Sequence, residues 1–375
     1  MKKSIYLLAA IALLASCNQE VVLVDAPEPQ PEVLRTIGFD TFVDKATRTT
    51  GVGTNSTSLN DFYPEFNVYG WKTVGGVTTD VFDNITVSYY DAENGKGVKP
   101  GAEWGDNVET GWYYKYIRYW DKMASKYQFS AYAPVAASGD VHCSEDGLIT
   151  IGTEAKPIKV ESTNLMEKPA KELAYTGFKY DYMTAQATDK VGEVSLVFSH
   201  LQAKLNVRIH LDKSITTAQD VSVQKVKIHN LGDKAYYTNE KNVGISGWTL
   251  SNVIDLLEQY IPSVEQAYTL NAKDNFNGYY IMEQLIIPQT IDKATDEAPQ
   301  LQPYTEACIY VEYTIGDEVF KSYSPLANIF SSAATYDFEG GKQYTVNIIV
   351  GPSPIEFTAE VATWADEIHG NHDIN

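Results

Sequence analysis

The sequence is short of cysteine and of basic residues. Its 375 residues include only three cysteines, too few for the disulfide framework of a small secreted domain. Lys and Arg number 29 against 49 Asp and Glu, so the formal net charge is −20 at pH 7. A chain this acidic repels phosphate backbones, which argues against nucleic acid as a partner. With 44% hydrophobic and 12% aromatic residues, the composition is nevertheless typical of a folded protein.

The sequence also lacks the short motifs of the common enzyme classes. It contains no G-x-S-x-G, HExxH, P-loop or G-x-G-x-x-G. His369, His372 and Asp373 offer only three metal ligands in a polar segment, so we expect a solvated terminus there. Asp91 to Gly95 lacks the regular oxygen spacing of an EF-hand loop and predicts a hairpin turn. We therefore expect no metal, no cofactor and no catalysis, with an unrecognised pair of glycosidase carboxylates as the open alternative.

The N-terminal residues predict an exported lipoprotein. Met1-Lys2-Lys3 precedes Ile5 to Ala15, an apolar run of eleven residues that is too short to span a bilayer. This run leads into Leu14-Ala15-Ser16-Cys17, which resembles the lipobox of bacterial lipoproteins. The resemblance implies cleavage before Cys17 and acylation of its thiol, with residues 1–16 as the signal peptide. A secretory peptide with an incidental cysteine, or a short membrane anchor, is the alternative.

Residues 17–36 contain Pro27, Pro29 and Pro31 and predict an extended, lipidated tether. Only two cysteines remain beyond this tether. Cys308 lies in an apolar, strand-like run, so we expect it to be a buried and inert thiol. A disulfide between Cys143 and Cys308 is the alternative.

The remainder of the chain is rich in strand signals and predicts an all-β fold with minor α content. Residues 37–43 alternate apolar and polar side chains, which is typical of a half-buried strand. Similar runs follow, separated by Gly, Asn and Asp turns and without long helices between them, a pattern that favours β-sandwiches over α/β units. One helix is expected at 253–261 from helical spacing of apolar residues. The other predicted strands are 66–71, 81–90, 113–120, 127–133, 194–198, 203–211, 221–229, 279–287, 308–315 and 344–350.

A polar stretch from Thr184 to Lys190 separates two strand-rich halves of the chain. We interpret it as the domain junction, which predicts an N-terminal β-sandwich domain over 37–190 and a C-terminal one over 191–375. His200, close to this junction, is expected to be a core histidine with satisfied hydrogen bonds rather than a ligand or a base.

Several short strings, in a fixed order along the chain, resemble those of the fimbrillin family of Bacteroides-type bacteria. They are Ile37-Gly38-Phe39, Thr47-Arg48-Thr49-Thr50, the stretch 66–70, Arg118-Tyr119-Trp120-Asp121, the stretches 127–134, 181–185, 197–207 and 341–344, and Val361-Ala362-Thr363-Trp364. The resemblance implies two transthyretin-like β-sandwich domains in tandem. It also implies a non-catalytic structural or adhesive subunit of a cell-surface fimbria, carried to the outer membrane by its lipid.

The resemblance further implies assembly by donor-strand exchange. In that scheme an arginine-specific protease removes an N-terminal strand, and a strand from another fimbrial subunit fills the vacated groove. Host or bacterial surface ligands are possible further partners. Only eleven residues follow Trp364, so a donor would have to come from the 344–364 hairpin. A hairpin integral to its domain would instead favour a tip, an anchor or a non-polymerising relative.

Arg48 is the expected processing site, with cleavage between Arg48 and Thr49 removing residues 37–48. It is flanked by Thr and followed by a Gly-rich run, as an exposed cleavable loop requires. Arg35 is the rival, but cleavage there would leave the 37–43 strand attached. The alternative is that Arg48 is an ordinary surface charge.

A second function remains open at this point. The chain has 26 Tyr and 6 Trp, and aromatic faces stack on sugar rings. The sequence is therefore also compatible with a surface glycan-binding lipoprotein of a nutrient-uptake system.

Overall fold

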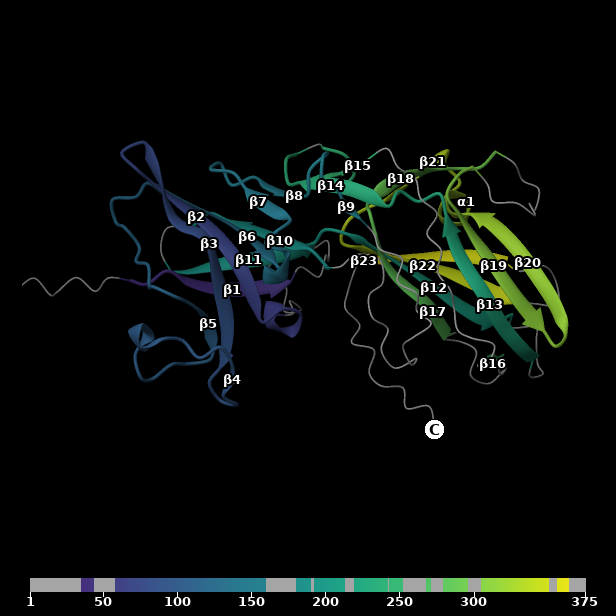
Figure 1. The fold of residues 1–375 in the computed structure, drawn as a ribbon, viewed down its shortest axis with the longest axis horizontal. Coiled ribbons are helices and arrows are strands. Elements are labelled where there is room, and N and C mark those ends of the chain that lie inside the picture. The colour runs from purple at the N-terminus through teal and green to yellow at the C-terminus, as the bar shows by residue number, and fades with distance from the viewer. Residues whose placement is uncertain are drawn as a thin grey trace, which may run out of the picture. The chain divides into compact units, whose positions relative to one another are not determined.

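The computed structural model describes residues 35–43, 58–159, 180–189, 192–212, 219–241, 243–251, 268–270, 279–295, 305–350 and 356–363. All of them belong to one compact unit, Arg35–Asn375. Strands dominate the described residues (Figure 1), so the all-β prediction is confirmed. No helix within these ranges is long and apolar enough to cross a membrane. The short helical elements are η1 (Leu59–Asp61), η2 (Ala102–Trp104), η3 (Val135–Ala137) and α1 (Leu326–Phe330).

The first sheet contains eight strands in the order β1-β11-β10-β6-β2-β3-β4, with β5 paired to β3. Strand β11 pairs in parallel with β1 through residues 193–198 and antiparallel with β10 through residues 199–200. The eight strands of this sheet are β1 (Gly38–Val43), β2 (Glu65–Val74), β3 (Val77–Asp91), β4 (Lys96–Gly97), β5 (Gly111–Tyr114), β6 (Lys126–Ala133), β10 (Met183–Ala187) and β11 (Glu193–His200).

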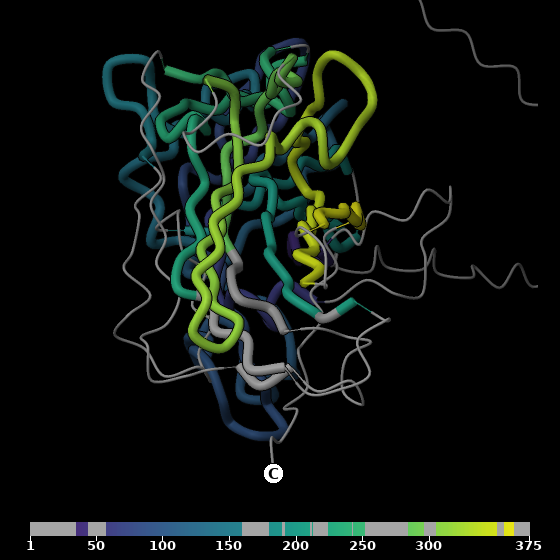
Figure 2. Tube along the Cα trace, turned by 90° about the vertical axis from the view of Figure 1, so that its right-hand side faces the viewer, coloured from purple at the N-terminus to yellow at the C-terminus, as the bar shows by residue number. Residues whose placement is uncertain are grey.

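Two four-stranded sheets follow, in the orders β17-β12-β22-β23 and β16-β13-β19-β20. Leu205, Val207, Ile309 and Val346 from these two sheets belong to one buried cluster. The β19–β20 hairpin is the long yellow-green hairpin in the foreground of Figure 2. The strands are β12 (Ala203–Leu211), β13 (Gln219–His229), β16 (Tyr268–Leu270), β17 (Tyr279–Ile286), β19 (Cys308–Ile315), β20 (Glu318–Pro325), β22 (Lys342–Val350) and β23 (Glu356–Thr363).

Two smaller sheets complete the described fold. One has the order β15-β14-β8-β7 with β9 on β14, and the other pairs β18 with β21. Strand β8 is joined to β14 through Tyr237↔Ile151, so residues more than eighty positions apart lie side by side. Their strands are β7 (Val141–Cys143), β8 (Ile149–Ile151), β9 (Ile158–Lys159), β14 (Lys234–Thr238), β15 (Trp248–Leu250), β18 (Gln289–Asp292) and β21 (Thr335–Phe338).

Strand pairing crosses the junction expected at residue 190. Strand β11, expected in the C-terminal domain, joins the first sheet, whereas β7, β8 and β9, expected in the N-terminal domain, share a sheet with β14. Part of the polar stretch is the strand β10 itself, where Met183 and Ala185 are buried, Thr184 is half-buried and Gln186 is exposed. This alternation is typical of a strand. The division into tandem transthyretin-like sandwiches at 190/191 stays a prediction.

Several local predictions can be compared with the structure. The strand predicted over 113–120 ends at Tyr114, because Tyr116 has a φ of 62°, in the left-handed region that interrupts a strand. Asp91 ends β3, and its Oδ1 accepts hydrogen bonds from the amides of Glu93 and Asn94, so the predicted turn is confirmed. The expected helix at 253–261 and the tail with His369 and His372 lie outside the described residues.

Both cysteines of the described fold are free and buried. The expectation of a buried Cys308 thiol is therefore confirmed, and the alternative of a disulfide with Cys143 is wrong. Burial raises the pKa of the Cys143 thiol to about 12, which keeps it in its unreactive protonated form.

Candidate functional site

Strand β1 is the edge strand of the first sheet, and its ladder to β11 runs from Gly38↔Glu193 to Val43↔Phe198. Ile37, just before it, and Phe39, Thr41 and Val43 within it are each no more than 4% exposed. The residues between them are less buried. The prediction that residues 37–43 form a strand with one buried face is confirmed.

Phe39 is the centre of the groove that β1 fills. Its ring lies edge-on against four other aromatic rings, with centroid distances of 5.4 to 6.0 Å. These rings come from four different strands, β2, β3, β5 and β6, and they are Phe66, Phe82, Tyr114 and Phe129. Because all four belong to one core cluster, β1 completes a core that the rest of the sheet leaves open at that edge.

The groove is an assembly of rings and aliphatic side chains, and its stability depends on β1. Full burial of a side chain such as Ile37, Phe39 or Val43 contributes about 1.5–3 kcal/mol each. Native domains are stable by only about 5–15 kcal/mol in total. Loss of β1 alone would therefore remove a large share of the stability of this sheet and expose an apolar slot.

Residues 115–120 form a segment that we call the strap, because it pairs with the chain just before β1. The amide of Ile37 donates to the carbonyl oxygen of Arg118 at 2.9 Å, and the amide of Trp120 donates to that of Arg35 at 2.9 Å. Thr36 and Tyr119 form an antiparallel bridge between them. The first residues of the described chain are thus fixed on both sides, by β11 and by the strap.

Side chains fix the strap in turn. The Arg118 guanidinium donates from Nε to the carbonyl oxygen of Val81 at 3.1 Å and from Nη1 to that of Lys115 at 3.2 Å and to that of Tyr116. The Trp120 indole donates to the carbonyl oxygen of Gly192, just before β11, at 3.0 Å.

Tyr114 connects β5 to the start of β1. Its hydroxyl donates to the carbonyl oxygen of Ile37 at 2.7 Å and accepts from the amide of Arg118 at 3.2 Å. Burial raises the pKa of Tyr114 to about 12, so the hydroxyl remains a proton donor throughout the neutral range. Sequence reasoning missed the strap and this contact, since the aromatic run from 113 onward was interpreted as a continuous strand.

A second edge strand lies near the C-terminus. Strand β22 is interior, between β12 and β23, and it buries Tyr344, Val346 and Ile348. Strand β23 pairs only with β22 among the described strands, and its Val361 is 50% exposed. The segments 37–43 and 356–363 therefore both lie in sheets, but only β23 of the 344–364 hairpin is peripheral.

The processing and lipidation residues predicted from the sequence, Cys17, Arg48 and Thr49, lie outside the described residues. Arg35 is described, and its carbonyl oxygen is hydrogen-bonded to the strap. His200 is 5% exposed and its Nδ1 lies 2.9 Å from Asp181 Oδ2, so the prediction of a core histidine is confirmed, and its hydrogen bonding is confirmed for Nδ1. Within the described ranges no group of three or more His, Cys, Asp or Glu side chains could hold a metal ion.

Comparison with known proteins identifies the family. A family model described as fimbrillin-like matches residues 47–364, most of the chain. The chain belongs to the fimbrillin-like family. Among curated proteins, the fimbrium subunit Fim1C of Phocaeicola vulgatus is 24% identical over 246 residues, which cover 63% of this chain and 59% of that protein.

One solved structure shares the fold. A fimbrial protein from Bacteroides vulgatus matches with a TM-score of 0.53 and 16% identity, over 88% of this chain and all of that one. A more distant match is the tip fimbrial protein Mfa3 from Porphyromonas gingivalis, with a TM-score of 0.39 and 11% identity over 80% of this chain and 94% of that chain.

Proposed function

We propose that this chain is a structural or adhesive subunit of a cell-surface fimbria, without catalytic activity, assembled by protease-triggered donor-strand exchange. Membership of the fimbrillin-like family supports the fimbrial role. The single observation that carries the mechanism is β1, an N-terminal edge strand whose inward side chains complete an aromatic core. It precedes residue 48 in the chain, so one cut after Arg48 separates it from the remaining sheet.

Removal of β1 creates a specific acceptor. The vacated edge of β11 presents unpaired N–H and C=O groups over six residues, about 20 Å of strand at ~3.3 Å per residue. The slot left by Ile37, Phe39 and Val43 takes alternate apolar side chains of an incoming strand. The ladder supplies affinity and the alternating pockets set the register.

Strand β23 is the donor that we propose. It leaves its own sheet by breaking one ladder only, that with β22, whereas extraction of β22 would remove Tyr344, Val346 and Ile348 from a buried core. Its alternating sequence, with Phe357, Ala359 and Val361 on one face, offers apolar side chains at the two-residue spacing that the slot requires. The chain then serves as a shaft subunit that both accepts and donates a strand.

The precursor is anchored by lipid in this proposal. Acylation of Cys17 holds it in the outer membrane, and residues 17–36 act as a tether that lets the folded part reach a neighbouring subunit. The partners are other fimbrial subunits, an arginine-specific protease and a ligand on a host or bacterial surface.

Cleavage of the full-length lipidated precursor by an arginine-specific protease tests the first step. N-terminal sequencing should give a chain that begins at Thr49, and Arg48→Ala should abolish this product. Arg48→Lys is the matched control, because it keeps the positive charge of the side chain and removes only the guanidinium group. A mature chain from cells that still contains residues 37–43 would refute activation by strand removal.

Addition of a synthetic peptide spanning residues 356–363 tests the second step. A ligand that binds only the folded form stabilises it by about 2.7 kcal/mol at 100 times its Kd, so the melting temperature of the cleaved chain should rise. The melting temperature of the uncleaved precursor, whose slot is filled by β1, should not change on addition of the peptide. A scrambled peptide should not change the melting temperature of the cleaved chain. Stabilisation of the uncleaved form, or no effect on the cleaved one, would contradict β23 as the donor.

A further inference from the structure

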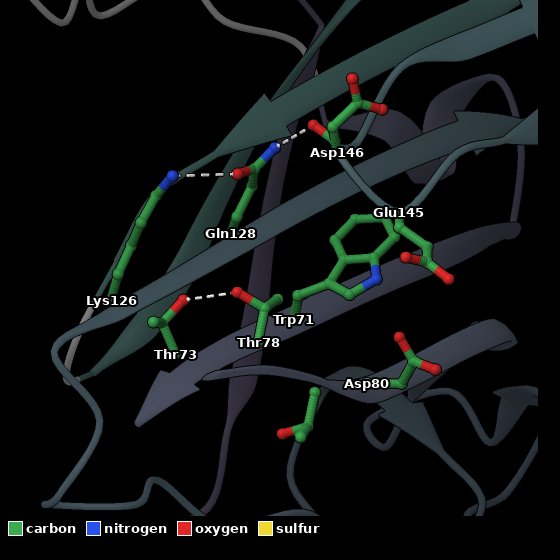
Figure 3. A pocket seen from close by; sticks show the side chains of 9 residues that line it. Trp71, Thr73, Thr78, Asp80, Lys126, Gln128, Glu145 and Asp146 are labelled. Atoms are coloured by element: carbon green, nitrogen blue, oxygen red, sulfur yellow. Dashed lines mark hydrogen bonds between the residues drawn. The ribbon is translucent and has the colours of Figure 1, made fainter. Parts of the chain in front are cut away.

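A hollow of about 810 Å³ lies on the face of the first sheet opposite to the β1 groove, and it is the second feature of this sheet with the properties of a binding site. Its size is in the range of small-molecule sites in proteins. The floor is made by three adjacent strands, β3, β2 and β6, and one wall is the turn between β7 and β8 (Figure 3).

Two rows of side chains cross the floor. In the first row Trp71 pairs with Asp80 on β3 and with Gln128 on β6. In the second row Thr73 is opposite Thr78 on one side and Lys126 on the other. Because directly paired residues of antiparallel strands project to the same face, both rows face the hollow. A rigid sheet therefore holds these groups in place.

The wall is fixed as firmly as the floor. Gln128 Nε2 donates to the carbonyl oxygen of Asp146 at 2.8 Å, and Ser130 Oγ and Gln186 Nε2 donate to that of Gly147 at 2.8 and 2.9 Å. Gly147 has a φ of +83°, and a Cβ there would lie 2.3 Å from Gln128 Nε2, so the turn requires glycine to approach this closely. The wall is thus preorganised without any ligand.

Trp71 forms the apolar part of the floor. The indole is 6% exposed and lies parallel to the ring of Tyr69, with centroids 6.3 Å apart, which helps to fix its orientation. It lines the hollow together with Asp80 and Glu145 (Figure 3). Because so little of the indole is accessible, the polar side chains around it supply most of the groups that a ligand can reach.

The free hydrogen-bonding groups around Trp71 define which ligands the hollow can bind. Asp80 and Glu145 receive no hydrogen bond and form no ion pair within the described parts of the chain, so both carboxylates can accept from a ligand. The Lys126 ammonium, 3.1 Å from Gln128 Oε1, keeps further protons to donate. The Thr73 and Thr78 hydroxyls lie 3.1 Å apart and offer both donor and acceptor capacity. The ligand must therefore both donate and accept.

Charge and hydrogen-bonding capacity disfavour two classes of ligand. Asp80, Glu145 and Asp146 against a single Lys126 make the lining net negative, which repels sialylated or sulfated sugars. Lys and Arg side chains of a basic peptide carry donors and no acceptor, so they leave the Lys126 ammonium without a partner although the net charge attracts them. A neutral polyhydroxylated ligand uses every one of these groups without such repulsion.

We infer that the hollow above Trp71 binds a neutral glycan, whose hydroxyls are hydrogen-bonded to Asp80 and Glu145. The ligand binds on a face that does not involve β1 or its removal. Binding should therefore be present in the uncleaved precursor and does not depend on strand exchange.

Binding of the full-length precursor to an array of neutral, sialylated and sulfated oligosaccharides, with a poly-lysine peptide as a further probe, tests this inference. We expect saturable binding of neutral oligosaccharides only, with an affinity that is nearly independent of salt concentration. A preference for poly-lysine that is lost at high salt, a preference for anionic glycans, or no saturable binding to any neutral glycan would overturn it.

Single variants localise the binding. Asp80→Ala and Glu145→Ala change exposed, unpaired side chains, so the fold should survive while the affinity falls about tenfold or more. Asp317→Ala, an exposed acidic residue in the β19–β20 turn, is the matched control and should bind as wild type does. Trp71→Ala should disturb the buried floor of the hollow and with it the fold, so the two carboxylate variants decide. Unchanged affinity in both would refute the site.

Discussion

The hydroxyl of Tyr114 donates a 2.7 Å hydrogen bond to the carbonyl oxygen of Ile37, 77 positions earlier in the chain. This contact joins the end of β5 to the residue that begins the inward-facing series Ile37, Phe39, Thr41 and Val43. The strap residue Arg118 accepts from the Ile37 amide at the same place. Both main-chain polar groups of Ile37 are therefore satisfied where the groove begins, which couples strand, strap and core.

Phe39→Ala should weaken the attachment of β1 more than any other single change within the strand. Deletion of a buried phenylalanine ring costs about 3–5 kcal/mol, because the four surrounding rings cannot close the cavity. Urea unfolding measures the total loss, and hydrogen exchange of the amides at 38–43 shows whether β1 detaches first.

Phe42→Ala is the matched control for that change. Phe42 is on the opposite face of the same strand and is only half-buried, so its loss should cost about 1 kcal/mol or less. Equal losses for Phe39→Ala and Phe42→Ala would show that β1 is not held by its inward face.

Tyr114→Phe should make the free energy of unfolding fall less steeply as the pH rises from 10 to 12. The folded pKa is about 12 against 10 for an unfolded tyrosine. Below pH 10 both states are protonated and the contribution of Tyr114 to stability is complete. Between pH 10 and 12 the unfolded chain releases a proton that the folded chain retains, so this contribution is lost as the pH rises.

Denaturant unfolding between pH 7 and 12 measures this effect. At pH 7 the variant should be less stable by about 1 kcal/mol, because the Ile37 carbonyl oxygen loses its donor. Tyr119→Phe, at a 47% exposed residue in the same strap, is the control for removal of a hydroxyl that is not hydrogen-bonded to Ile37. If the free energy of unfolding of Tyr114→Phe falls with pH as steeply as that of the wild type, other groups cause the alkaline transition.

Gly70→Ala should destabilise the core beneath β1 by about 1–3 kcal/mol through overpacking. A Cβ at this position would lie 2.9 Å from Phe82 and 3.0 Å from Phe129, two of the rings that contact Phe39. Gly139→Ala is the control, since a Cβ there would meet nothing within 4 Å and the φ of Gly139 is not positive. Thermal unfolding of both variants should separate them clearly; comparable melting temperatures would contradict tight packing at Gly70.

Cys17→Ser should leave the precursor unlipidated and mislocalised while its folded part stays intact. Thiol acylation needs the sulfur, and residue 17 precedes Arg35, where the described fold begins. Growth with a labelled fatty acid, followed by membrane fractionation, checks this. Label retained by the serine variant would exclude Cys17 as the acylated residue, and a wild-type chain without label would exclude lipidation.

The sequence by itself determined which residues of β1 face inward. Alternation at Ile37, Phe39, Thr41 and Val43 is a local property, because successive side chains of any strand project to opposite faces. The all-β class, the turn at Asp91 and the burial of Cys308 were also predictable, since each depends on the chemistry of a few neighbouring residues.

Only the tertiary structure decided which strands pair and what closes the groove. Alternation specifies a face but no partner, so the parallel pairing of Phe39 with Val194, and that of β8 with β14, could not be read from either segment alone. The strap was hidden for the same reason: its aromatic residues look like a strand until the left-handed backbone at Tyr116 turns them toward Arg35 and Ile37. The hollow above Trp71 likewise exists only because β3, β2 and β6 align and the β7–β8 turn is tied above them, and such long-range contacts are selected by packing of the whole chain rather than by local preference.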